Sequence, residues 1–123
     1  MQTIEPTISM VEAISHAIRV LFANYFGKAP VDTDTFIHGD LVICRLHGTL
    51  TPGEARHAAE DPEVVAALRA ALHAQLAPAA IDAVERITGE AVVSHMSTKD
   101  PRADEAIEVF VLASPPTRSS VPI

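Results

Sequence analysis

Residues 35–48 read TFIHGDLVICRLHG. Two apolar runs flank the pair Gly39-Asp40, and glycine at the first central position of a two-residue loop allows the positive φ that a type II′ turn requires. The stretch therefore predicts a β-hairpin with arms at residues 31–38 and 41–47. In the second arm, Val42, Cys44 and Leu46 share one face. Because that face is too apolar to meet water, helices are expected to cover it.

Helical signals precede the hairpin. Ser9 followed by Glu12 has the spacing of a capping box, and apolar residues then recur every three or four positions up to Phe26. Gly27 can take the left-handed conformation that ends a helix, and Pro30 prevents its continuation. We therefore expect an amphipathic helix over residues 9–26.

Two more helix starts follow the hairpin. Residues 51–54, TPGE, form a second capping box and predict a short helix ending near residue 59. Residues 61–63, DPE, repeat the signal and open a long helix that ends before Gly89, with Pro78 predicting a kink or a break near residues 76–77. The expected inward stripe of this helix is Val65, Leu68, Leu72, Leu76, Ala80, Val84 and Ile87.

The C-terminal part of the pattern predicts a second hairpin. Its strands are expected at residues 90–96 and 106–112, with a polar loop over 97–104 between them. The order is then α-β-β-α-α-β-β, which favours an α+β fold in which one four-stranded antiparallel sheet has helices packed on one face. We expect a loose lead over 1–8, a single domain over 9–112, and a disordered or loosely packed tail over 113–123.

Composition limits the partners and the compartment. The chain has 16 acidic and 9 basic residues and a formal charge of −7. Such a charge repels phosphate backbones and anionic lipid, so we expect neither a nucleic-acid partner nor direct membrane insertion. No apolar run approaches the roughly 20 residues of a membrane span. The first residues lack a signal-peptide pattern, and Cys44 is the only cysteine, so a cytoplasmic location is expected.

Five short motifs together resemble the MpsC-like family, over residues 9–112. The family is named for a component of a sodium-translocating, membrane-potential-generating system. The resemblance implies an accessory role beside a membrane transport system, and it supplies no catalytic residues. Most of the motifs are turn and cap residues, which concern shape more than chemistry. They are GKAP at 27–30, FIHGDLV at 36–42, LHGTLTPGE at 46–54, AVERITG at 83–89 and EVFVL at 108–112.

Few residues suggest chemistry. His38 and Asp40 flank the turn glycine, and a carboxylate beside an imidazole can orient a general base or a metal ligand. On a tight turn, however, both side chains are expected to point to water. Cys44 is expected in the core, where a thiol is inert. The remaining histidines lack a short metal-ligand spacing such as His-x-x-x-His. We therefore predict no catalytic, cofactor or metal residues.

Arg45 is the most informative single residue of the hairpin. It shares a strand face with Leu41 and Ile43, so its stem lies on apolar surface while its guanidinium can pair with an acidic group. The expected pairing is an internal one, with Glu108 as a candidate. An acidic group of a partner is the alternative.

Two functions follow. The favoured hypothesis is a non-enzymatic cytoplasmic interaction domain that forms a homodimer or larger homo-oligomer through its sheet or its helices, and the motive is an open sheet face bearing Leu41, Ile43 and Phe110 or their counterparts. Its further partner would be a membrane transport component. Three imidazoles and carboxylates converging in one sheltered place would instead indicate an active site. The alternative is a small-molecule-binding domain or small enzyme with a pocket between the long helix and the hairpins, contacted by His38, Asp40, Arg45 and His95.

Overall fold

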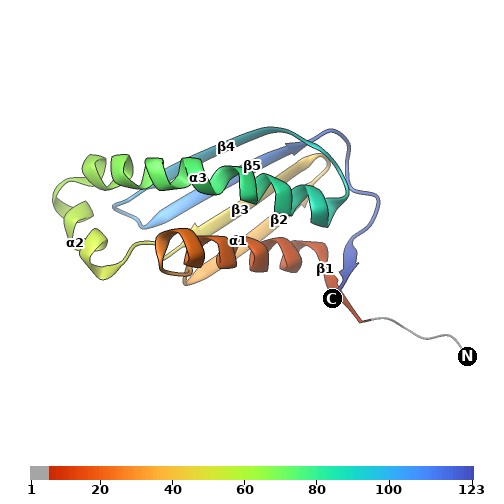
Figure 1. Ribbon diagram of the computed structural model, residues 1–123, viewed down its shortest axis with the longest axis horizontal. Coiled ribbons are helices and arrows are strands. Elements are labelled where there is room, and N and C mark those ends of the chain that lie inside the picture. The colour runs from red at the N-terminus through yellow and green to blue at the C-terminus, as the bar shows by residue number, and fades with distance from the viewer. Residues whose placement is uncertain (1–5) are drawn as a thin grey trace, which may run out of the picture.

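The computed structural model describes residues 6–123, and Figure 1 shows its elements. In chain order they are β1 (Thr7–Ser9), α1 (Met10–Phe26), β2 (Asp32–His38), β3 (Leu41–His47), α2 (Pro52–Glu60), α3 (Pro62–Thr88), β4 (Val92–Asp100), β5 (Glu105–Leu112) and β6 (Ser120–Pro122).

Two antiparallel hairpins form one sheet with the order β2-β3-β5-β4. Gly39 has a φ of 60°, and His38 pairs with Leu41, so the first hairpin closes through the two-residue loop that the sequence predicts. The central pairing of β3 with β5 joins the hairpins. The α+β fold with its four-stranded antiparallel sheet is therefore confirmed.

The helices α1 and α3 lie side by side across one face of the sheet, as Figure 1 shows. Ser9 Oγ accepts a hydrogen bond from the Glu12 N–H, and Gly27 takes a φ of 77°, so both predicted ends of α1 are confirmed. The core between the helices and the sheet is aliphatic, with Phe22 and Phe110 as its largest members. The other sheet face is left without helices in the described chain.

The second hairpin is tighter than the sequence predicts. β4 extends to Asp100, so the expected polar loop over 97–104 is wrong for its first half, and a turn of residues 101–104 remains. Asp104 adopts a positive φ of 52°, and its carboxylate accepts hydrogen bonds from the N–H groups of Thr49 and Leu50. These hydrogen bonds connect the turn of the second hairpin to the segment that leads into α2. The strand pattern of the sequence does not predict this connection.

The long helix α3 differs from prediction in two ways. It continues from Pro62 to Thr88 past Pro78, so the break does not occur. Its N-terminal half also turns a different side inward: Leu68 is 66% exposed and Leu72 is exposed, while Arg69 and His73 are buried. The predicted stripe is therefore wrong at these two leucines. It is confirmed at Val65, Leu76, Ala80 and Val84.

The length and composition of α3 would also allow it to cross a membrane. The expectation that no segment is long and apolar enough is wrong by that measure. In the structure, however, α3 packs along α1 and the sheet, and its buried Arg69 forms an ion pair with Glu54. About 28% of the most apolar 18-residue stretch of α3 is buried inside the structure.

Two short terminal strands complete the structure. β1 pairs with β6, and Val121 is buried against the main core. The sequence predicts a loosely packed tail over 113–123, and the structure places this strand within it. Of the predicted lead over 1–8, the first five residues lie outside the described residues.

Candidate functional site

A row of polar side chains crosses the helix-covered face of the sheet. The pairing register aligns Thr35 with Cys44, Cys44 with Glu108, and Glu108 with Ser97. Glu108 is completely buried, although its neighbours along β5 on the same face are apolar. A buried carboxylate is costly unless charged or hydrogen-bonded partners surround it. The groups around Glu108 therefore decide what this part of the core can do.

Two histidines converge on the Glu108 carboxylate. His73 reaches it from α3, with 2.6 Å between Nε2 and Oε1, and His95 reaches it from β4, with 3.2 Å between Nε2 and the same oxygen. His95 also stacks on Phe110, with ring centroids 4.6 Å apart. The second carboxylate oxygen, Oε2, is buried and has no hydrogen-bond partner within residues 6–123. We call these three residues, His73, His95 and Glu108, the His–Glu–His cluster.

The electrostatics of the cluster favour an ionised carboxylate. Burial alone raises the pKa of Glu108, but the hydrogen bonds from His73 and His95, and the charge of their imidazolium forms, lower it below its usual value. The carboxylate thus stays charged inside the core because both imidazoles face it. The cluster is consequently a fixed negative group with two nitrogen groups directed at it.

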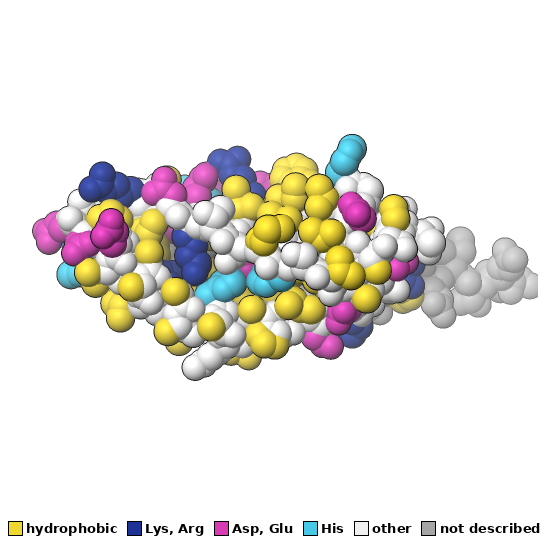
Figure 2. Space-filling view, turned by 90° about the horizontal axis from the view of Figure 1, so that it is seen from above, with side chains coloured by type: hydrophobic (Ala, Val, Ile, Leu, Met, Phe, Trp, Pro, Cys, Tyr) yellow, Lys and Arg dark blue, Asp and Glu magenta, His cyan; other side chains and the backbone are white. Residues whose placement is uncertain are grey.

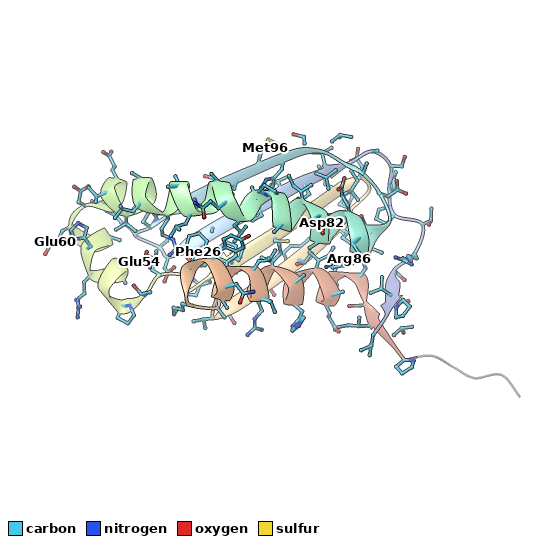
Figure 3. The ribbon with its side chains drawn as sticks, viewed as in Figure 1. Phe26, Glu54, Glu60, Asp82, Arg86 and Met96 are labelled. Carbon is cyan, nitrogen blue, oxygen red and sulfur yellow. The ribbon has the colours of Figure 1, made fainter. Side chains whose placement is uncertain are left out.

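Two cationic side chains adjoin the cluster on one side. Arg69 is 3% exposed, one helical turn before His73, and its guanidinium lies 4.1 Å from the ring centroid of Phe26. It donates hydrogen bonds of 3.0 and 3.1 Å to the two carboxylate oxygens of Glu54. Figure 3 shows Phe26 and Glu54 at this end of the helices. Burial lowers the pKa of Lys99, with Glu108 opposing that shift and Arg69 adding to it.

Cys44 lies beside the cluster but is not part of its chemistry. Burial raises the pKa of its thiol to about 11, which the hydrogen bond from Thr35 only partly offsets. The Thr35 hydroxyl also hydrogen-bonds Ser15 of α1, at 2.7 Å. A protonated, buried thiol is a poor nucleophile, as the sequence predicts.

The structure separates the four candidate contacts. His38 and Asp40 are exposed at the hairpin turn, and Arg45 is exposed on the open face of the sheet. Arg45 pairs with Glu105 at 2.5 Å, so an internal ion pair is correct but Glu108 is the wrong partner, because it points to the opposite face. His95 alone of the four belongs to the His–Glu–His cluster.

Sequence reasoning missed His73 and Glu108, although signals for both exist. Glu108 alternates with the apolar Ala106 and Phe110, so an inward-facing acid can be read from β5. Arg69 and His73 have the i, i+4 spacing that puts two polar side chains on one helical face. The stronger leucine pattern of α3 concealed that second face.

The cluster offers three ligand atoms for a metal ion or a proton. The two imidazole nitrogens and a carboxylate oxygen all lie within 4.8 Å of one another. About 10% of each imidazole side chain is exposed, whereas Glu108 is fully covered. Figure 2 shows His side chains in the middle of the upper face, beside Lys or Arg side chains. Two imidazoles and a carboxylate thus converge in one sheltered place, the arrangement that, judged from the sequence, would indicate an active site.

Comparison with known proteins gives one match. The family model described as Na+-translocating membrane potential-generating system (MpsC) matches residues 7–114. Neither curated proteins nor solved structures gave a match. The matched segment runs from β1 through β5 and contains all three residues of the His–Glu–His cluster. The chain therefore belongs to the MpsC family, whose members are linked by that description to a Na+-translocating, potential-generating membrane system.

Proposed function

We propose that this protein is a cytoplasmic accessory domain of a membrane Na+-translocating system, and that it self-associates through the open face of its sheet. Family membership supplies the link to that system. The self-association is carried by one observation, an apolar row that crosses all four strands of the uncovered face. A second copy of this chain is the proposed occupant of that face.

The apolar row is defined by the strand register. Phe36 pairs with Ile43, Ile43 with Val109, and Val109 with Met96. We call these four residues the open-face row. Its two ends are the most exposed, with Phe36 at 57% and Met96 at 54%. Met96 projects from β4 away from the helices, as Figure 3 shows. The prediction that Leu41 and Ile43 face outward is correct, but Phe110 faces the core, and Val109 and Val111 take its place.

The face suits a two-fold pairing with itself. Large apolar side chains end the open-face row on both edge strands, so a two-fold rotation can place one end over the other. The four strands lie about 4.8 Å apart, and the seven paired residues along each strand are about 3.3 Å apart. The open face therefore measures roughly 20 Å in each direction. Two such faces in contact would bury roughly 800 Å² in total, less than the about 1,000 Å² of a stable specific interface, so the proposed association is of the weak, transient class. The charges of the face lie toward one end, around Asp34 and Arg45.

Sedimentation equilibrium tests this proposal. The wild type is expected to form a dimer or larger oligomer at high micromolar concentration, and the double substitution Phe36→Ser, Met96→Ser is expected to weaken association at least tenfold. Leu68→Ser is the matched control, because Leu68 is an equally exposed apolar residue on α3, away from the sheet face. A wild type that stays monomeric, or a control that dissociates as far as the double variant, would refute the proposal.

The alternative of a ligand-binding or enzymatic domain has one supporting observation. The His–Glu–His cluster lies between α3 and the β4–β5 hairpin, the location that the alternative assigns to its pocket. A partly open hollow nearby, lined in part by Phe22, Arg69 and Lys99, has a volume of only about 10 Å³, enough for roughly one water molecule. None of the three residues of the His–Glu–His cluster lines this hollow, so its volume does not limit what the cluster could bind. A thermal-shift screen of metabolites tests this alternative, since a bound ligand must raise the melting temperature.

A further inference from the structure

We propose that His73, His95 and Glu108 form a binding site for one divalent transition-metal ion, with Zn2+ as the best fit. The inference is independent of the proposed self-association, because all three ligands come from one chain and face away from the open side of the sheet. It concerns a site in the core, between α3 and the second hairpin.

The geometry is close to that of a bound metal. Tetrahedral zinc with bonds of about 2.0–2.1 Å holds its ligand atoms roughly 3.4 Å apart. The Glu108 Oε1 atom is 2.6 Å from the His73 nitrogen and 3.2 Å from the His95 nitrogen, and the three ligand atoms span at most 4.8 Å. Small side-chain rotations, without backbone movement, would open the space for an ion between them.

The carboxylate has unused capacity. Both imidazoles share Oε1, while Oε2 is buried and unpaired within the described residues. Buried polar atoms in native proteins nearly always have a partner, so an atom without one calls for an explanation. An ion bound between the imidazoles and the carboxylate would balance the negative charge of Glu108. The two hydrogen bonds to Oε1 balance that charge only in part.

The types of ligand suit zinc, and so do the rigid elements that hold them in place. Two imidazoles and one carboxylate are a set with which proteins hold zinc while leaving a fourth position open for water or substrate. The ligands come from a helix and two paired strands, and the stacking of His95 on Phe110 fixes one ring. About 10% of each imidazole side chain is exposed, and the two rings reach the carboxylate from α3 and β4, which gives an ion a path inward.

The two nearby cationic side chains, Arg69 and Lys99, need not repel a bound metal ion. Arg69 is balanced by Glu54, whose carboxylate accepts both of its short hydrogen bonds. Lys99 is only partly buried, so its flexible ammonium group can move toward solvent when a metal binds. The ion would lie between the two imidazole nitrogens and the Glu108 carboxylate, whose negative charge offsets one of its two positive charges.

Metal binding to the full chain can be tested after treatment with a chelator. Isothermal titration with Zn2+ is expected to show one site per chain, and Co2+ in its place is expected to give the visible absorption of a tetrahedral site. His95→Gln should weaken Zn2+ binding at least tenfold. His47→Gln is the matched control, because His47 is also a strand histidine near carboxylates but lies on the open face.

Circular dichroism establishes that each variant is folded before titration. Should His95→Gln fail to fold, Glu108→Gln replaces it, since an amide can keep hydrogen bonds to both imidazoles but is a poor metal ligand. No Zn2+ uptake by the wild type at micromolar concentration would overturn the site. So would equal binding by a folded cluster variant, or loss of binding in His47→Gln.

Discussion

Two neighbouring rows of the same sheet have opposite polarity and opposite surroundings. On the covered face, the row through Glu108 is polar, and its two central residues, Cys44 and Glu108, are buried beneath the helices. On the open face, the adjacent row from Phe36 to Met96 is apolar and exposed at both ends. Simple burial of apolar surface would give the reverse arrangement. Each row is therefore a place where burial of apolar surface alone does not explain the arrangement, and substitutions there test whether it costs stability.

Substitutions in the two rows are also expected to differ in their effect on the free energy of unfolding. A buried charged group interacts strongly with its neighbours because water does not screen it. An exposed apolar side chain changes the stability of a single chain little, and its effect appears only when a partner covers it. Substitutions in the two rows should therefore separate stability from association.

The largest effect is expected from breaking the His–Glu–His cluster at its centre. Glu108→Ala leaves two imidazoles without an acceptor and creates a cavity, and should lower the free energy of unfolding by about 3 kcal/mol. The triple substitution His73→Leu, His95→Leu, Glu108→Met removes all the polar groups together, and should be as stable as the wild type or more so. Urea unfolding in the presence of a chelator measures both.

A triple variant as unstable as Glu108→Ala would mean that the cluster itself stabilises the core. In that case its polarity would need no functional explanation.

The two halves of α3 extend the comparison to the helix layer. Leu76 is completely buried and Leu68 is exposed, so Leu76→Ala should cost about 2–5 kcal/mol whereas Leu68→Ala should cost less than about 0.5 kcal/mol. The same substitution at two positions of one helix controls for helix propensity. Equal losses in thermal unfolding would show that Leu68 is also covered, contrary to the structure.

A smaller and pH-dependent effect is expected at Glu54. Burial raises the pKa of this carboxyl, but the hydrogen bonds from Thr51 and the charge of Arg69 lower it below its usual 4.5. The stabilisation is thus complete above pH 4.5 and is lost as the pH falls through the lower folded value. Glu54→Gln should cost about 1–2 kcal/mol at pH 7. The urea midpoints of the two proteins should converge below pH 4.5, and a constant difference would contradict the assignment.

The smallest effect is expected on the open face. Phe36→Ser removes an exposed ring and a cross-strand contact with Ile43, and should lower the stability of the isolated chain by less than about 1 kcal/mol. Dilute protein must be used, because self-association would add its own stabilisation. A loss as large as that of Glu108→Ala would show that the two rows do not differ in the way proposed.

The fold was largely predictable because its signals are local. Gly39 fixes the hairpin turn, Ser9 and Gly27 fix the ends of α1, and the Thr51–Glu54 capping box fixes the start of α2. Each depends on residues within four positions of one another. The errors lie where distant contacts decide. Asp104 closes its turn by binding Thr49 and Leu50, more than fifty positions away.

The candidate site was predictable for only one of its members, His95. His73 and Glu108 are separated from it by 22 and 13 positions, and they meet only because α3 crosses the sheet above β5. The leucines at positions 68 and 72 favoured one rotation of α3, and the ion pair of Arg69 with Glu54 accompanies another. Single-sequence periodicity cannot weigh such a contact against two apolar side chains.

By itself, the sequence determined the turns, the helix ends, the strand alternation and hence the α+β architecture, because these depend on backbone conformations and hydrophobic spacing within a few residues. The tertiary structure decided the rotation of α3 about its axis and the meeting of two imidazoles on one buried carboxylate. Those depend on which side chains can satisfy one another across the core. No local propensity contains that information.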